Sequence, residues 1–189
     1  MPNGTTETHM NPPSDAGLTL RTLGQSPRLA RGDETVLGPG KPLALIVYLS
    51  VADGHSATRE FLLDLLWSDL EPDRARHALR QTLWYIRSVF GDSFLFGREE
   101  LTLGENLDSD RGRFLAAVAA GDPERAAQSY TGEFLPDFAL PGSTEFEQWA
   151  HIERTRLRAT FVRAGEMLVR RQLSGGRAEE EIADGIGHA

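Results

Sequence analysis

The chain has no cysteine and no long apolar segment. The absence of cysteine excludes disulfides, iron–sulfur clusters and thiolate zinc sites, and it agrees with a reducing compartment. The longest apolar run, residues 43–52, is about half of the roughly twenty residues that a membrane-spanning helix needs, and it contains Tyr48 and Ser50. We therefore expect a cytoplasmic protein that makes no membrane contact.

Positive charge is also scarce. The formal net charge is −8 and the isoelectric point is near 5.1, whereas domains that hold nucleic acid by general charge attraction are usually basic. Any DNA binding must therefore come from a local patch. A chain of 189 residues with 40% apolar composition can form one ordinary domain or two small ones around a filled core.

Motifs for catalysis, metals and cofactors are missing. The segment Gly38–Lys41 is similar to a phosphate-binding loop, but Thr35 and Pro42 stand where that motif requires glycine and a hydroxyl residue. The five histidines are scattered and lack the spacing of a zinc site. We predict that the protein is not an enzyme and has no catalytic residues, no metal site and no cofactor.

The first half of the chain predicts a small sheet followed by three helices. Residues 1–16 contain three prolines and lack an apolar stretch, which predicts a disordered tail. Residues 18–23 alternate with period two, and residues 28–30 and 36–37 can pair with them. Pro42 suits the first turn of one helix, and Thr58 can cap a second helix with a buried face of Phe61, Leu62, Leu65 and Leu66.

The third helix is predicted over residues 72–90, between Pro72 and the stop signal Gly91. Apolar residues recur along it at spacings of three and four, which directs one side into the core. The other side is almost free of acid, and arginine there can engage a guanine edge or a phosphate. An ordinary solvated charged face is the alternative interpretation. The outward residues are Arg74, Arg76, His77, Arg80, Gln81, Trp84, Tyr85 and Arg87.

A hairpin follows the third helix. Residues 94–96 and 101–103 flank a polar turn that carries Arg98. The order of these elements, a small sheet, three helices and a hairpin, predicts that residues 17–104 form an α+β winged helix. We predict Arg76, Arg80 and Gln81 as base readers, with His77 and Trp84 able to contact base or phosphate. The predicted phosphate contacts are Lys41, Arg59, Arg74, Arg87 and Arg98, although an ordinary surface residue is a slightly better explanation of Lys41.

Past residue 103 the alternation of apolar and polar residues that is typical of strands ends. We therefore place a domain boundary between Gly104 and Leu107 and expect residues 105–174 to be entirely helical. The acids of residues 108–110 are interpreted as complementing a helix dipole, and residues 122–124 as starting the next helix. A long helix should run from about residue 146 to about residue 173, and residues 175–189 carry too few apolar residues to bury a face, so we expect them to be frayed.

Several segments resemble one regulator family. The first half resembles the OmpR-like winged helix of the Streptomyces antibiotic regulatory proteins (SARPs), and the second half is similar to their bacterial transcriptional activator domain. The resemblance spans residues 18–173. It rests on Thr58–Glu60, Leu65–Trp67, Ala75–Gln81, Gly121–Asp122, Tyr130–Leu135, Phe146–Trp149 and Glu153–Leu157.

This resemblance implies an OmpR/PhoB-like winged helix followed by an all-α domain of tetratricopeptide (TPR)-like pairs. The third helix would enter the major groove of promoter repeats in double-stranded DNA, and the helical domain would support homo-oligomers and contact with RNA polymerase. His77 replaces an asparagine that is frequent in the family, and Trp84, Tyr85 and Ser88 replace small or basic residues, which predicts a weaker phosphate grip. Relatives continue through further helix pairs, so a partial activator domain is expected.

A second function remains open from the sequence. The acidic balance also fits a protein-interaction module, or a truncated regulator that modulates a full-length relative without strong DNA binding of its own. Salt-dependent binding to DNA separates the two hypotheses.

Overall fold

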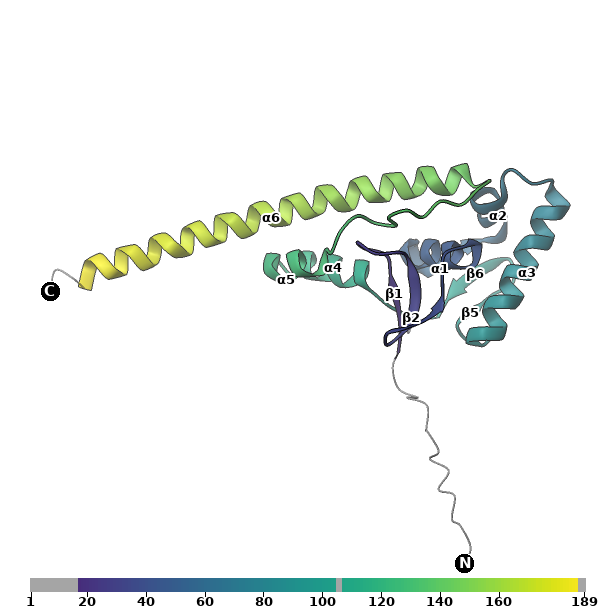
Figure 1. Ribbon diagram of the computed structural model, residues 1–189, viewed down its shortest axis with the longest axis horizontal. Coiled ribbons are helices and arrows are strands. Elements are labelled where there is room, and N and C mark those ends of the chain that lie inside the picture. The colour runs from purple at the N-terminus through teal and green to yellow at the C-terminus, as the bar shows by residue number, and fades with distance from the viewer. Residues whose placement is uncertain (1–16, 105–106, 187–189) are drawn as a thin grey trace, which may run out of the picture.

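The computed structural model describes residues 17–104 and 107–186, with side chains described as far as residue 174. The predicted N-terminal tail lies outside these residues. Figure 1 shows two small sheets with helices α1 to α3 beside them, and one long helix, α6, crossing the molecule and continuing beyond it. The buried apolar residues of both halves form a single cluster. The predicted boundary near residue 105 therefore does not separate two cores.

The first sheet has four strands in the order β3-β2-β1-β7. Strands β1 (Leu18–Arg21), β2 (Arg28–Arg31) and β3 (Glu34–Leu37) are antiparallel neighbours, as predicted. Strand β7 (Leu107–Ser109) pairs with β1 in parallel. The prediction of an all-helical second half is wrong here, because a strand of three residues is too short to show a period of two.

The three predicted helices are present. Helix α1 (Lys41–Val51) has proline in its first turn and is largely buried, and α3 (Pro72–Phe90) ends at Gly91. Helix α2 (Arg59–Trp67) is capped by Thr58, whose hydroxyl accepts from the Phe61 N–H at 3.2 Å. The predicted burial of Phe61 is wrong: its side chain is exposed and its ring lies 5.2 Å from the ring of Tyr48, at the margin of the core.

The second sheet carries the predicted hairpin. Strands β5 (Leu95–Phe96) and β6 (Glu100–Leu103) are antiparallel, and β4 (Ser56–Thr58) adds a third strand on the other side of β6. A short 3₁₀ turn, η1 (Asp53–His55), precedes β4. Strand β4 was not predicted; it places the start of α2 directly beside the hairpin.

The helical region comprises α4 (Asp110–Ala119), α5 (Pro123–Ser129) and α6 (Thr144–Ile186). Helices α4 and α5 pack on each other, and α6 contacts both α5 and α2. The predicted end of α6 near residue 173 is wrong, because the helix continues to Ile186; alanine, glutamate and arginine, which favour a helix, recur in this stretch. No described helix combines the length and apolarity that crossing a membrane requires.

The loop after α5 returns to the N-terminal strand region. The Gly24 N–H donates to the Glu133 carbonyl at 2.9 Å, and the Leu135 N–H donates to the Thr22 carbonyl at 2.8 Å. Gly24 is needed because a Cβ there would lie 2.5 Å from the Thr131 carbonyl oxygen, and its φ is +68°. Phe134 is completely buried between the halves.

The start of α4 is tied to the same region. The Ser109 hydroxyl caps the helix by accepting from the Gly112 N–H at 2.9 Å. The Asp110 carboxylate does more than complement the helix dipole, because it accepts from the Thr22 N–H at 2.7 Å, the Thr22 hydroxyl at 2.8 Å and the Leu23 N–H at 2.9 Å. Asp110 thus joins α4 to the end of β1.

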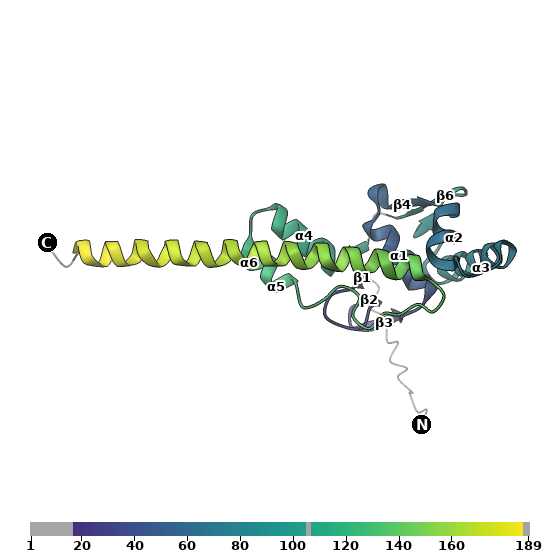
Figure 2. The same ribbon diagram turned by 90° about the horizontal axis from the view of Figure 1, so that it is seen from above.

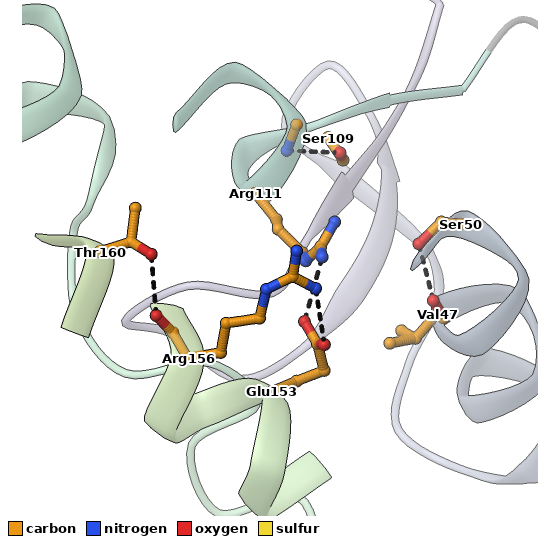
Figure 3. A network of polar contacts seen from close by, with 8 residues as sticks. Val47, Ser50, Ser109, Arg111, Glu153, Arg156 and Thr160 are labelled. Carbon is orange, nitrogen blue, oxygen red and sulfur yellow. Dashed lines mark hydrogen bonds and ion pairs between the residues drawn. The ribbon is translucent and has the colours of Figure 1, made fainter. Parts of the chain in front are cut away.

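A buried ion pair joins α4 to α6. Arg111 and Glu153 lie 3.0 Å apart with side chains only 12% and 9% exposed, and Arg156 approaches the other oxygen of Glu153 at 3.3 Å. Figure 3 shows both guanidinium groups beside this one carboxylate. The pair fixes the N-terminal part of α6 to the start of α4.

Candidate nucleic-acid interface

The outer side of α3 is open to solvent. Its apolar residues Ala75, Leu79, Leu83 and Ile86 are buried, so the side chains between them face outward. Figure 1 shows α3 at the end of the molecule opposite the free end of α6. Trp84 is 72% exposed, an unusual position for an indole. The exposed residues of this side are Arg74, Arg76, His77, Arg80, Gln81, Trp84 and Tyr85.

The guanidinium groups on this side are largely unengaged by acids. Within the described residues, no carboxylate lies within 4.0 Å of Arg74 or Arg80. Arg76 pairs with Asp73 at 3.0 Å, but both side chains are exposed, and such pairs contribute about 0.3–0.5 kcal/mol. A phosphate or base could replace Asp73 at little cost.

A hollow of about 490 Å³ lies between α3 and the start of α2. Two of its arginines bind the hairpin: Arg87 donates to the Leu95 carbonyl at 2.9 Å and the Gly97 carbonyl at 3.3 Å, and Arg59 donates to the Arg98 carbonyl. These contacts hold the hairpin against α2 and α3, and they occupy some of the N–H groups that were predicted to bind phosphate. The hollow is lined by Arg59, Arg80, Leu83, Trp84, Arg87, Ser88 and Asp92.

The hairpin turn carries mixed charge. Arg98 is exposed at the turn, next to the exposed Glu99 and Glu100. Gly97 is required because a Cβ there would lie 1.9 Å from the Glu100 carbonyl oxygen, at a φ of +100°. A second hollow of about 350 Å³ brings Glu60 and Glu99 beside Arg59, Arg76 and Arg80. These acidic neighbours of Arg76 and Arg80 were not predicted, because the pairing of β4 with β6, which brings the hairpin to the start of α2, is not local.

Lys41 does not belong to this surface. Its ammonium donates to the Ser143 hydroxyl at 2.6 Å and to the Leu66 carbonyl, and it lies 5.5 Å from the centre of the Trp67 ring. Burial lowers the pKa of Lys41 from its ordinary value, against a smaller opposing influence of Asp69. The predicted phosphate contact is therefore corrected: Lys41 ties α1 to the end of α2 and the start of α6.

The structure thus brings ten of the eleven predicted residues to one end of the molecule, on α3, at the start of α2 and in the hairpin; Lys41 is the exception. Ser88, which lines the hollow, was singled out by the sequence only as a departure from the family pattern. Among the residues with described positions, no group of three or more histidine or acidic side chains could hold a metal ion.

The fold defined by these elements is a winged helix joined to a helical region. It is similar to that of Mycobacterium tuberculosis EmbR, in a structure of EmbR in complex with a low-affinity phosphopeptide: the TM-score is 0.65 and the identity 23%, over 88% of this chain and 48% of the EmbR chain. At this identity the likeness establishes the fold, and this chain spans about half the length of that EmbR chain. No protein-family model and no curated protein matches the sequence.

Proposed function

We propose that the protein is a cytoplasmic, sequence-specific DNA-binding transcription regulator of the SARP type, with α3 in the major groove of promoter DNA. The observation that carries the proposal is the solvent-exposed, arginine-bearing side of α3 on a winged-helix fold. A major groove about 12 Å wide admits one helix, and arginine and glutamine side chains match guanine and adenine edges there. The structural similarity to EmbR supports the winged-helix fold on which the proposal depends.

The residues divide into two roles. Arg76, Arg80 and Gln81 lie on α3 at spacings that face one groove and are proposed to read bases, with His77, Trp84 and Tyr85 beside them. Arg74 and Arg98 are proposed to bind phosphates. Arg59 and Arg87 primarily position the hairpin, since their guanidinium groups already hold its backbone, and they contact phosphate with the remaining N–H groups.

The helical region is proposed to be TPR-like and to act as an activator domain. Helices α4 and α5 form one packed pair, and α6 lies against it. In this proposal the region contacts RNA polymerase and supports oligomers on promoter repeats.

A mobility-shift experiment tests DNA binding. A binding sequence is first selected from random double-stranded DNA, and its affinity is then measured between 50 and 200 mM salt. If two to four phosphates are engaged, plots of log affinity against log salt concentration should fall with a slope of about −0.9 per contact. Binding that is independent of salt, or no enrichment of any sequence, would contradict the proposal.

Arg80→Ala is the most informative variant, because Arg80 is exposed and free of carboxylate partners among the described residues. We expect it to weaken specific binding by about 1–3 kcal/mol if the guanidinium contacts a base edge. Arg125→Ala, an exposed arginine of α5, is the control with the same change of charge. Equal losses in the two variants would remove the base-reading role of Arg80.

One observation favours the second candidate function, a protein-interaction module with weak DNA affinity. Glu60 and Glu99 lie beside the arginines of α2 and α3, and their negative potential opposes approach to phosphate. If this second function holds, no selected DNA binds more tightly than a scrambled sequence. Mixing the protein with a full-length relative should then change the mass of the complex measured by light scattering.

A further inference from the structure

Helix α6 projects from the body of the protein. Figures 1 and 2 both show it running well past α4 and α5. One of its sides is covered: Leu157 and Ala164 are buried, and Phe161 is half-buried against the ring of Tyr130 at 4.5 Å. Near the end of this contact Arg171 reaches Glu124 of α5 at 3.3 Å. The opposite side is uncovered.

Among the described residues, α6 exposes five large apolar side chains, and three of them lie in one line on the uncovered side. Val162, Val169 and Leu173, here called the apolar stripe, are separated by seven and four residues and therefore lie along one side of the helix. Their side chains are 51%, 54% and 64% exposed. Single exposed apolar residues are ordinary, but a stripe on a projecting helix is typical of a surface that packs against another helix.

An arginine row flanks the apolar stripe. Arg156, Arg163 and Arg170 recur every seven residues, and the last two directly follow Val162 and Val169. In the described part of the chain, no carboxylate lies within 4.0 Å of Arg163 or Arg170. Arg156 binds Glu153 but keeps a side chain 68% exposed. The row is a local positive edge on a chain whose net charge is −8.

We propose that the apolar stripe and the arginine row together bind an amphipathic helix of a partner protein whose apolar residues are flanked by aspartate or glutamate. The stripe would bury the partner's apolar residues, and the row would pair with its carboxylates, as flanking charges do in coiled coils. The charge pattern selects this partner, since a neutral or basic helix leaves the arginines unpaired.

The same pattern disfavours a second copy of this chain. Glu166 lies four residues after Val162 on the stripe, so parallel pairing of two α6 helices would place Glu166 opposite Glu166. Antiparallel pairing that stacks Val169 on Leu173 would bring Arg170 beside Arg170. Like charges at such positions act against an association.

The test uses the whole protein and labelled synthetic helices in fluorescence anisotropy. One peptide has four heptads with leucine at its core positions and glutamate at the flanking positions. Two matched peptides, called the glutamine twin and the lysine twin, carry glutamine or lysine at the flanking positions instead. We expect the glutamate peptide to bind at least about tenfold more tightly than the glutamine twin, and the lysine twin more weakly still. The variant R156Q/R163Q/R170Q should abolish this preference. The control R31Q/R113Q/R125Q removes the same charge from exposed arginines elsewhere and should retain it.

A second variant, V162S/V169S/L173S, should weaken all three peptides, with circular dichroism confirming that the helix remains. Three results would each overturn the proposal. The first is equal affinity for the glutamate and glutamine peptides, and the second is an unchanged preference in R156Q/R163Q/R170Q. The third is a parent protein that dimerises in sedimentation and loses the dimer in V162S/V169S/L173S. Because the row lies on α6, R156Q/R163Q/R170Q should bind DNA as the parent does, so failure here is distinguishable from failure of the proposed function.

Discussion

Replacing Asp110 with alanine tests whether the two halves of the chain form one cooperative unit. The Asp110 carboxylate accepts from two backbone N–H groups, those of Thr22 and Leu23, and from the Thr22 hydroxyl. Thr22 and Leu23 are both buried, so Asp110→Ala leaves their N–H groups without an acceptor. A buried donor without a partner costs about 1–3 kcal/mol.

Asp110 itself is half-buried, so water can replace part of the lost bonding. We expect Asp110→Ala to lower the free energy of unfolding by about 3 kcal/mol, a large part of the roughly 5–15 kcal/mol of an ordinary domain. Urea unfolding followed by tryptophan fluorescence and far-ultraviolet circular dichroism measures the loss. Both signals should change in one transition in the parent protein, because the halves share one core.

Ser109→Ala is the matched control. It removes the cap of the same helix, the bond from the Gly112 N–H, but no contact with the N-terminal strand. Loss of such a cap costs about 1 kcal/mol. If Asp110→Ala were no more destabilising than Ser109→Ala, the tie between α4 and β1 would contribute nothing and the reasoning would be refuted.

Two further predictions concern buried polar groups. Glu153→Leu should destabilise the protein by about 3–5 kcal/mol, because it leaves Arg111 charged and buried, and adding Arg111→Met should recover most of that loss in urea unfolding; equal stability of the single and double variants would contradict this. Tyr130→Phe should raise the free energy of unfolding by about 1 kcal/mol, because the Tyr130 hydroxyl is buried with no hydrogen-bond partner among the described residues. Burial raises the pKa of Tyr130, with Glu133 adding to the rise and Arg158 opposing it. The unfolded chain therefore loses this proton first as pH rises above 10, which lowers the stability of the parent but not of Tyr130→Phe. The advantage of the variant should be larger at pH 10.5 than at pH 7, and a smaller advantage would contradict the assignment.

Local signals allowed much of the fold to be predicted. Helix α3 has a proline at its start, a glycine at its end and leucines at helical spacing between them, and all three are properties of one continuous segment. The exposed arginines of this helix follow from the same periodicity. The hairpin was predictable for a similar reason, since its two strands and turn are adjacent in the chain.

Contacts between distant segments could not be predicted. Lys41 looked like a surface residue because nothing near it in the sequence indicates Ser143, which lies 102 residues away. Strands β4 and β7 have three residues each and acquire their strand character only from β6 and β1. The acids beside Arg80 come from α2 and the hairpin, so the charge of the interface was overestimated from α3 alone.

The tie between Asp110 and Thr22 has a consequence for synthesis on the ribosome. Thr22 emerges early, yet its carboxylate partner follows 88 residues later, and Phe134, which forms a β-bridge with the neighbouring Leu23, comes later still. At about 5–20 residues per second the first strand must wait several seconds for its last contacts. Nascent chains that stop at the hairpin would hold Leu23 uncovered, a surface suited to capture by a chaperone.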